Sequence, residues 1–161
     1  MKSTRPDVPK SYGLREAAGP DDLLPWEWTE ARLVDARNYW VVTSDGDGEP
    51  HAMPVWGIWL AGGLLFSTAR RSRKALNLSG NPKIVIHLDS GDEVVVIEGE
   101  AREVADRSVL REYVDAYQAK YALKPDVDQA GTVNFEVRPR TVFGWSEADY
   151  PNTATRWEFA V

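Results

Sequence analysis

The sequence predicts a mainly β protein of the α+β class, built as a small antiparallel barrel, closed or split, with a few flanking helices. Short segments rich in aromatic and β-branched residues follow one another closely along the chain. Turn sequences such as SDGDGEP and LAGG separate them, which favours antiparallel hairpins. The helical segments fall between strands without regular alternation, as in a barrel rather than a parallel α/β sheet.

Residues 1–25 mix proline, glycine and charges without a period, and we expect them to form an N-terminal arm on a single domain of residues 26–161. Thr29 is the expected N-cap of a helix that continues to about Asn38. YWVVT and HAMPVWGIW are then predicted to form a hairpin around SDGDGEP. Pro54 cannot donate a ladder hydrogen bond, so the second strand is expected at a sheet edge or at a bulge.

LLFST is the next predicted strand, and it leads into STARRSRKALNLSGNP. Ser72 is the expected N-cap of a helix that ends at Gly80. KIVIHLD and EVVVIEGEAREV follow as strands, and Asp106 is expected to cap a helix with an apolar face. TVNFEV, TVFGW and TRWEF complete the set of predicted strands.

The composition limits the classes of protein to which the chain could belong. Its 161 residues are 43% hydrophobic and include seven tryptophans, which is enough for a core that needs no disulfide. The chain has no cysteine and no apolar signal segment at its N-terminus, so we expect a cytoplasmic location. A net charge of −6 disfavours binding along a nucleic acid, and no apolar run is long enough to span a bilayer. We therefore expect neither a nucleic acid nor a membrane as a partner.

The most informative stretch is RRSRK, which contains Arg70, Arg71, Arg73 and Lys74. A helix N-terminus carries a partial positive charge, so cations there are disfavoured by roughly a few tenths of a kcal/mol each unless an anion lies between them. The stretch therefore predicts one small anionic ligand at the helix start, near Arg73 and Lys74. The alternative is a solvated basic loop.

The order of the motifs HAMPVWGIW, GLLFSTARRSRKALNLSGNPKIVIHL and EVVVIEGEAREV resembles the flavin-binding split-barrel family related to pyridoxamine 5'-phosphate oxidases. Within that family, the chain is most similar to the branch of oxidoreductases that use FMN or the deazaflavin F-420. The resemblance covers about Trp28 to Val104. It implies a six-stranded antiparallel split barrel of Greek-key type, and a homodimer with two cofactors bound at the interface.

The resemblance also implies which residues bind the cofactor. Those assigned to the phosphate are Ser67, Thr68, Ser72, Arg73 and Lys74, with Asn77 as a further contact, and those whose strand lines the ring are Met53, Pro54, Val55 and Trp56. For Trp56, packing in the core or at a dimer contact is the alternative. Trp145 and Arg156 are candidates for contacts with the partner subunit or with the substrate.

No catalytic side chain is singled out, because the cofactor ring would carry the hydride. No metal site is expected either, because neither His51 nor His87 occurs in a sequence spacing typical of metal ligands and the chain has no cysteine. The surplus cations Arg70 and Arg71 favour the longer acidic tail of F-420 over FMN, unless they point to water or pair with Asp and Glu of the partner subunit.

Two departures argue against oxidation of pyridoxamine phosphate itself. Glu93 stands where the vitamin B6 oxidases carry glutamine, and TRWEFAV does not match their C-terminal substrate segment. We therefore expect hydride transfer to another small conjugated organic substrate. The alternatives are a non-catalytic protein of the same fold that binds or stores FMN or haem, and a dimeric interaction protein with an empty cleft.

Overall fold

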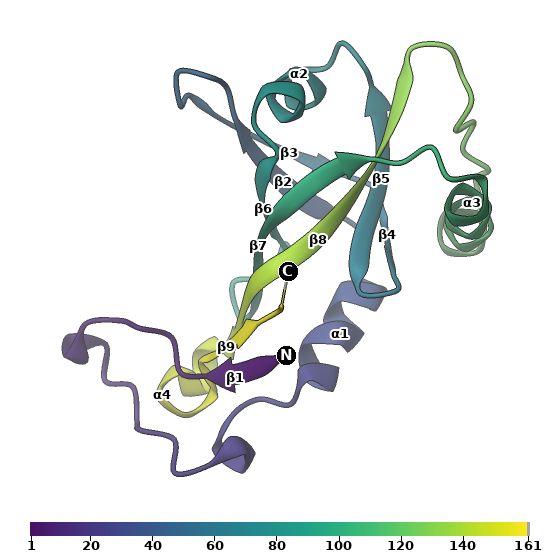
Figure 1. The fold of residues 1–161 in the computed structure, drawn as a ribbon. Coiled ribbons are helices and arrows are strands. Elements are labelled where there is room, and N and C mark those ends of the chain that lie inside the picture. Colours follow the sequence, from purple (N-terminus) through teal and green to yellow (C-terminus); the bar gives the residue numbers. More distant parts are fainter. Residues whose placement is uncertain (161) are drawn as a thin grey trace.

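The computed structural model describes residues 1–160 and shows one antiparallel β-sheet that curves into an open barrel with helices around it (Figure 1). Each pair of adjacent strands in this range is antiparallel. The predicted mainly β fold with a few flanking helices is confirmed. The expected number of six strands is wrong, because the described residues form nine.

The strands are β1 (Lys2–Thr4), β2 (Tyr39–Ser44), β3 (Pro50–Val55), β4 (Ile58–Leu60), β5 (Gly63–Ala69), β6 (Lys83–His87), β7 (Glu93–Glu103), β8 (Thr132–Ser146) and β9 (Thr155–Glu158). The α-helices are α1 (Trp26–Asp35), α2 (Arg73–Gly80), α3 (Arg107–Tyr121) and α4 (Tyr150–Thr153). Short 3-10 turns cover Lys10–Tyr12, Pro20–Asp22 and Glu147–Asp149.

The longest strand, β8, pairs with three others: with β7 along most of its length, with β5 at its N-terminal half and with β9 near its C-terminal end. The sheet order is β1-β9-β8-β7-β6-β2-β3, and β4 joins through β5. TVNFEV and TVFGW, expected as two strands, are therefore one. The strand passes through Pro139 beside a β-bulge, in which Arg140 of β8 has no counterpart between the pairs Glu98–Thr141 and Gly99–Pro139. A bulge is a place where a sheet accommodates proline.

HAMPVWGIW, expected as one strand, is divided at Gly57 into β3 and β4. A Cβ atom on Gly57 would lie 2.8 Å from the backbone oxygen of Leu65, so the chain approaches β5 there more closely than another residue would allow. After this point β4 pairs with β5, while β3 pairs only with β2. The predicted edge position of Pro54 is confirmed, and the outer edge of β3 has no partner among the described strands.

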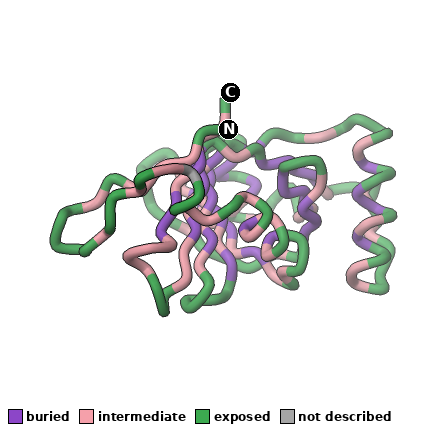
Figure 2. The backbone as a smooth tube through the Cα atoms, turned by 90° about the horizontal axis from the view of Figure 1, so that it is seen from below, coloured by how far each residue is buried: buried purple, intermediate pink, exposed green. Residues whose placement is uncertain are grey.

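Side chains of the strands fill the barrel, where Tyr39 and Trp157 have no exposed surface. A smaller apolar cluster, which includes Ile58, Leu65 and Tyr113, lies between β4, β5 and α3. Figure 2 shows the buried positions concentrated in the strands and along one side of α3. The apolar face predicted for α3 is thus the face that packs.

The predicted caps of two helices are confirmed. Ser72 is the N-cap of α2 and accepts a hydrogen bond from the N–H of Ala75, and α2 ends at Gly80 as expected. Asp106 caps α3 and accepts from the N–H groups of Ser108 and Val109. No helix in residues 1–160 is long and apolar enough to span a membrane.

The prediction for α1 is wrong at both ends, because the helix begins at Trp26, directly after Pro25, and ends at Asp35. Thr29 is an interior helical residue with 0% exposure, and its side chain packs against the barrel instead of capping a helix. Residues before α1 lie near the C-terminal elements, since β1 pairs with β9. The guanidinium of Arg5 donates to backbone oxygens of Asp22 and Asn152, among others, at 2.8 to 3.0 Å.

Replacement of Gly99 by alanine is expected to destabilise the fold by roughly 1–3 kcal/mol, because a Cβ atom there would lie 2.3 Å from the backbone oxygen of Arg138. The free energy of unfolding in urea measures the effect. Gly91→Ala is the control, since a Cβ atom at Gly91 meets nothing within 4 Å. Equal stability of the two variants would contradict the tight pairing at the bulge.

Candidate functional site

The candidate site is built around the start of α2, where β5 passes into the basic stretch. The hydroxyls of Thr68 and Ser72 lie 3.2 Å apart, and Ser72 also caps the helix. Arg73 and Lys74 are the first two residues of the helix. The fold therefore brings four of the predicted phosphate residues to one helix N-terminus, which favours anions.

Arg73 already has an anionic partner within the chain. Its guanidinium lies 2.9 Å from the carboxylate of Asp45 and 4.0 Å from that of Glu49, both in the turn between β2 and β3. Asp45 also accepts hydrogen bonds from the N–H groups of Glu49 and Asp47, and these bonds, together with Arg73, hold the pKa of Asp45 below its ordinary value. A ligand that reaches Arg73 must compete with this carboxylate.

Lys74 is in a different position, because it takes part in no ion pair within residues 1–160. Its side chain is half-buried, and this burial lowers the pKa of the ammonium group. A partly desolvated cation at the positive end of a helix is unfavourable for two reasons at once. Lys74 is thus a cation of the helix start that, unlike Arg73, has no anionic partner within residues 1–160, and the predicted anion would bind next to it.

The two further cations of the stretch, Arg70 and Arg71, differ in their contacts. Arg70 forms a bidentate ion pair with Glu103, with N–O distances of 3.0 and 3.1 Å, and this contact raises the pKa of Arg70. Arg71 is exposed and has no ion pair in the described part of the chain. The preference for a longer acidic cofactor tail therefore depends on Arg71 alone.

Two of the expected phosphate contacts are directed elsewhere. The hydroxyl of Ser67 donates to Asn134 at 2.7 Å and lies 3.3 Å from the hydroxyl of Tyr113, so it faces α3, on the opposite side of β5 from Thr68. Asn77 is only 5% exposed and donates to the hydroxyl of Thr43 at 3.0 Å. Its side chain fastens α2 to β2, whereas the guanidinium of Arg73 pairs with Asp45.

The four residues expected beside the cofactor ring lie at the edge of the sheet. Met53 and Pro54 are exposed on β3, and Val55 is half-buried against the core. Trp56 follows β3, is 38% exposed and stacks on Tyr121 with a centroid distance of 4.7 Å and an interplanar angle of 2°. Trp56 is therefore neither a core residue nor fully solvated.

Trp145 and Arg156 lie far from α2 within one chain. Trp145 is near the C-terminal end of β8, opposite Val94, whereas Thr68 pairs with Val133 at the other end of that strand. Arg156 lies on β9 opposite Phe143 and pairs with Glu158 at 2.8 Å. One copy of the chain therefore does not bring these two residues to the phosphate site.

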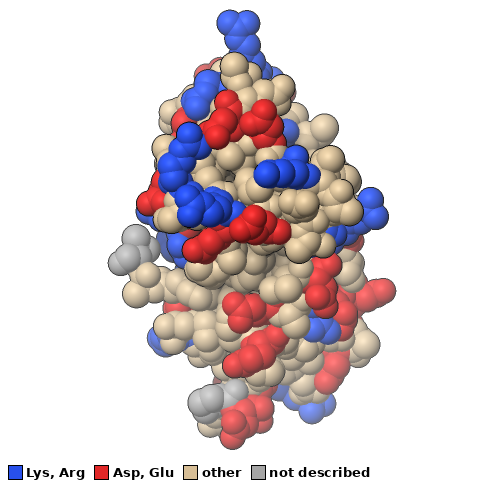
Figure 3. Space-filling view, turned by 90° about the vertical axis from the view of Figure 1, so that its right-hand side faces the viewer, with Lys and Arg blue, Asp and Glu red and all other residues tan. Residues whose placement is uncertain are grey.

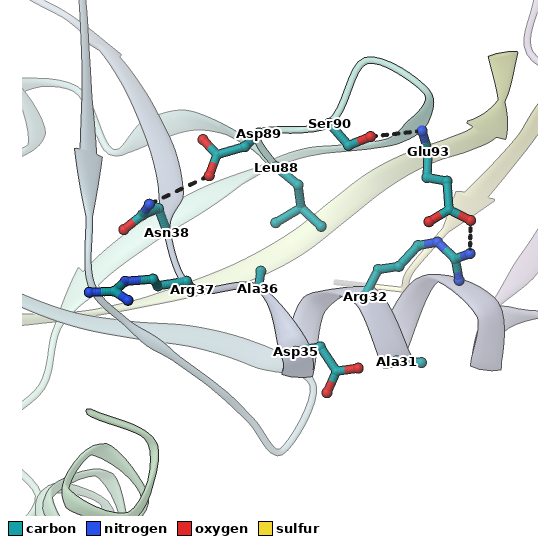
Figure 4. A pocket seen from close by; sticks show the side chains of 10 residues that line it. All are labelled: Ala31, Arg32, Asp35, Ala36, Arg37, Asn38, Leu88, Asp89, Ser90 and Glu93. Atoms are coloured by element: carbon teal, nitrogen blue, oxygen red, sulfur yellow. Dashed lines mark hydrogen bonds and ion pairs between the residues drawn. The ribbon is translucent and has the colours of Figure 1, made fainter. Parts of the chain in front are cut away.

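A separate hollow lies between the end of α1 and the turn from β6 to β7 (Figure 4). Arg32 and Glu93 form an ion pair across it, and Asn38 donates to Asp89 at 3.5 Å. The residue expected to distinguish the chain from vitamin B6 oxidases, Glu93, is thus bound to α1. The residues predicted to bind the cofactor do not line this hollow.

Charged side chains on the face seen in Figure 3 are mixed, with Asp and Glu beside the Lys and Arg groups of its upper half. Ion pairs within the described residues include that of Arg107 with Asp128. Asp45, Glu49 and Glu103 are not among the residues expected at the site, although the acidic turn SDGDGE complements RRSRK in charge. The composition of that turn is the signal that could have indicated Asp45 and Glu49, whereas Glu103 is at the end of β7. The contacts of all three residues depend on the fold.

Comparison with known proteins places the chain in a family. The profile described as pyridoxamine 5'-phosphate oxidase matches residues 28–146. The pyridoxine/pyridoxamine 5'-phosphate oxidase of Photobacterium profundum is 31% identical in an alignment of length 117 that covers 65% of this chain and 56% of that protein. The chain belongs to the pyridoxamine 5'-phosphate oxidase family, and it spans about half the length of this relative.

Solved structures agree on the fold. A conserved hypothetical protein from Mycobacterium tuberculosis has a TM-score of 0.66 and 24% identity, over 81% of this chain and 90% of that one. An F420 reductase has a TM-score of 0.57 and 23% identity, over 70% of this chain and 94% of that one. At these identities the likeness shows the split-barrel fold, as the sequence predicts.

Asn77→Ala is expected to lower the free energy of unfolding by roughly 1–3 kcal/mol, because it removes a buried hydrogen bond between α2 and β2. Thermal or urea unfolding provides the measurement. Ser79→Ala on the exposed side of the same helix is the matched control, with an expected change within about 0.5 kcal/mol. A stable Asn77 variant would show that this contact does not hold the helix.

Proposed function

We propose that the chain is an oxidoreductase that binds a phosphate-bearing flavin-type cofactor, F-420 or FMN, and transfers hydride between it and a small conjugated organic substrate. The observation that carries the proposal is the half-buried Lys74 ammonium, which has no ion pair in residues 1–160 and lies at a helix start beside Arg73. A phosphate there would neutralise it with charge-assisted hydrogen bonds.

The residues present fit such a group. Ser72, Thr68 and the first N–H groups of α2 offer donors around the phosphate position, and Lys74 and Arg73 offer charge. The outer edge of β3, which pairs with no other described strand, offers backbone groups to a planar ring. Membership of the pyridoxamine 5'-phosphate oxidase family and the fold likeness to an F420 reductase support both cofactors.

The roles in the reaction follow from this arrangement. A bound cofactor of this type supplies the hydride, while the protein supplies binding, orientation and exclusion of water. Thr68, Ser72, Arg73 and Lys74 would fix the phosphate end, and β3 with Trp56 would orient the ring end. We assign no general acid or base to the chain.

The proposed protein is a homodimer, and the outward face of the sheet supports this. A row of directly paired positions crosses it from Pro54 through Trp40, His87, Val96 and Phe143 to Arg156. The side chains from Trp40 to Phe143 in this row are half-exposed in one chain. A second copy on this face would bury them and would carry its own Arg156 toward a cofactor cleft.

Replacement of both Arg73 and Lys74 by alanine is expected to weaken binding of FMN and of F-420 by at least about a hundredfold, since two charge-assisted contacts are lost. Fluorescence titration of the cofactor-free protein at low and physiological salt measures it. The cofactor that binds with the higher affinity is then assigned as the natural cofactor of the protein. A Soret band in the purified protein would instead favour a haem-binding role.

The matched control removes one arginine and one lysine elsewhere, through Arg111→Ala with Lys124→Ala. Both residues are exposed, on α3 and just after it, and the net charge change is the same. We expect the control to retain the affinity of the unmodified protein. Loss of affinity in both double variants, or in neither, would contradict the assignment of the phosphate to α2.

Val96→Glu should convert the dimer to a monomer, because it places a charge in the middle of the half-exposed row. Size-exclusion chromatography with light scattering measures the mass. Leu123→Glu, at an apolar side chain that is 54% exposed, is the control and should leave the dimer intact. A dimeric Val96 variant would show that the copies associate through another face.

A further inference from the structure

A second hollow lies where the link between β3 and β4 meets the end of α1 and the last turn of α3. Its lining consists of Asp35, Arg37, Trp56, Lys120 and Tyr121. Two of these side chains are aromatic, two are cationic and one is anionic. None of them is among the predicted phosphate residues, and only Trp56 was expected near the cofactor.

The aromatic part of this hollow is held rigidly. The indole of Trp56 is parallel to the ring of Tyr121, and the hydroxyl of Tyr121 lies 2.9 Å from the oxygen and 3.1 Å from the nitrogen of Gly57. The same hydroxyl lies 2.8 Å from the backbone oxygen of Arg37. Trp56 therefore presents a fixed, 38% exposed aromatic surface, on which another planar group can stack.

The charges of the hollow leave one cation without a partner. Lys120 donates to the backbone oxygen of Val34 at 3.0 Å and to the hydroxyl of Tyr39 at 3.1 Å, and the carboxylate of Asp35 acts on it electrostatically. Arg37 forms no ion pair in residues 1–160. Its guanidinium is 5.8 Å from the centre of the Trp56 ring, and Figure 4 shows it pointing away from Arg32 and Glu93.

The position of the hollow relates it to the phosphate site. Asp45, the partner of Arg73, follows the end of β2 that pairs with Pro50, whereas Trp56 follows the other end of β3. A strand of six residues is about 20 Å long, so β3 separates the two sites by roughly that distance. A cofactor laid along β3 with its phosphate at α2 would direct its ring toward Trp56.

We propose that this hollow binds a planar conjugated carboxylate, stacked against Trp56 and paired with Arg37, and that such acids are the substrate class of the enzyme. The identification as a substrate site rests on the proposed function. The guanidinium of Arg37 matches a carboxylate with two parallel hydrogen bonds, and its single uncompensated charge suits a monoanion. The flat indole surface selects conjugated ligands over saturated ones.

The test is calorimetric titration of the full chain with 2-naphthoate and with the uncharged 2-naphthamide, which have the same ring system. We expect the acid to bind about tenfold more tightly than the amide, because only the acid forms a charge-assisted pair with Arg37. Arg37→Gln should lower the affinity for the acid to that for the amide. Arg111→Gln, which removes the same charge from exposed α3, should preserve the preference.

A second variant tests the stacking surface. Trp56→Leu should lower the affinity for both ligands by a similar factor of about ten. Circular dichroism shows whether the variant is folded. Equal affinity of the acid and the amide for the unmodified protein would overturn the proposal. A preference for the acid that survives Arg37→Gln, or ligand binding that is unchanged in a folded Trp56 variant, would also overturn it.

The same preparations are titrated with FMN and F-420, so that the two proposals fail separately. Cofactor binding that depends on Arg73 and Lys74, without any preference for the acid, would overturn the acid site and leave the proposed function standing. A preference that depends on Arg37, without binding of either cofactor, would overturn the proposed function and leave a site for planar acids.

Discussion

The pairing of β8 with three neighbours is the interaction on which the rest of the structure depends. One strand of 15 residues closes the barrel against β7 and β5 and also receives β9, to which β1 is added. A straight strand could not serve both halves of a curved sheet. The bulge beside Gly99 and the passage through Pro139 provide the bend, since a bulge increases local twist and interrupts the ladder where proline has no donor.

A consequence of this closure is that β3 and β4 are left unpaired with each other, and the candidate sites lie at the two ends of β3. Near the turn from β2 to β3, Arg73 pairs with the acidic residues Asp45 and Glu49 of the hairpin, and Lys74 follows it at the start of α2. Near Gly57, the chain turns toward β5 and leaves Trp56 against Tyr121. The edge of β3 exposes backbone groups that most proteins shield from other chains, and here a planar ligand could bind against them.

Charge pairing within the chain separates the structural cations from the available ones. Arg70 and Arg73 are bound to Glu103 and Asp45, and two arginines, Arg102 and Arg138, share the buried carboxylate of Glu136. Lys74 and Arg37 have no such partner in the described range. Pairs at an exposed surface contribute little energy, so a phosphate or carboxylate with better geometry can displace or supplement them.

The sequence by itself determined the fold class, the caps at Ser72 and Asp106 and the edge position of Pro54, because each follows from local chemistry: alternation, side-chain capping and a missing donor. Only the tertiary structure decided that Asn77 faces Thr43, that Ser67 faces α3 and that Asp45 reaches Arg73. It also decided the contact of Arg37 and Tyr121 with Trp56. These contacts join residues that are distant in the chain, so no local pattern encodes them.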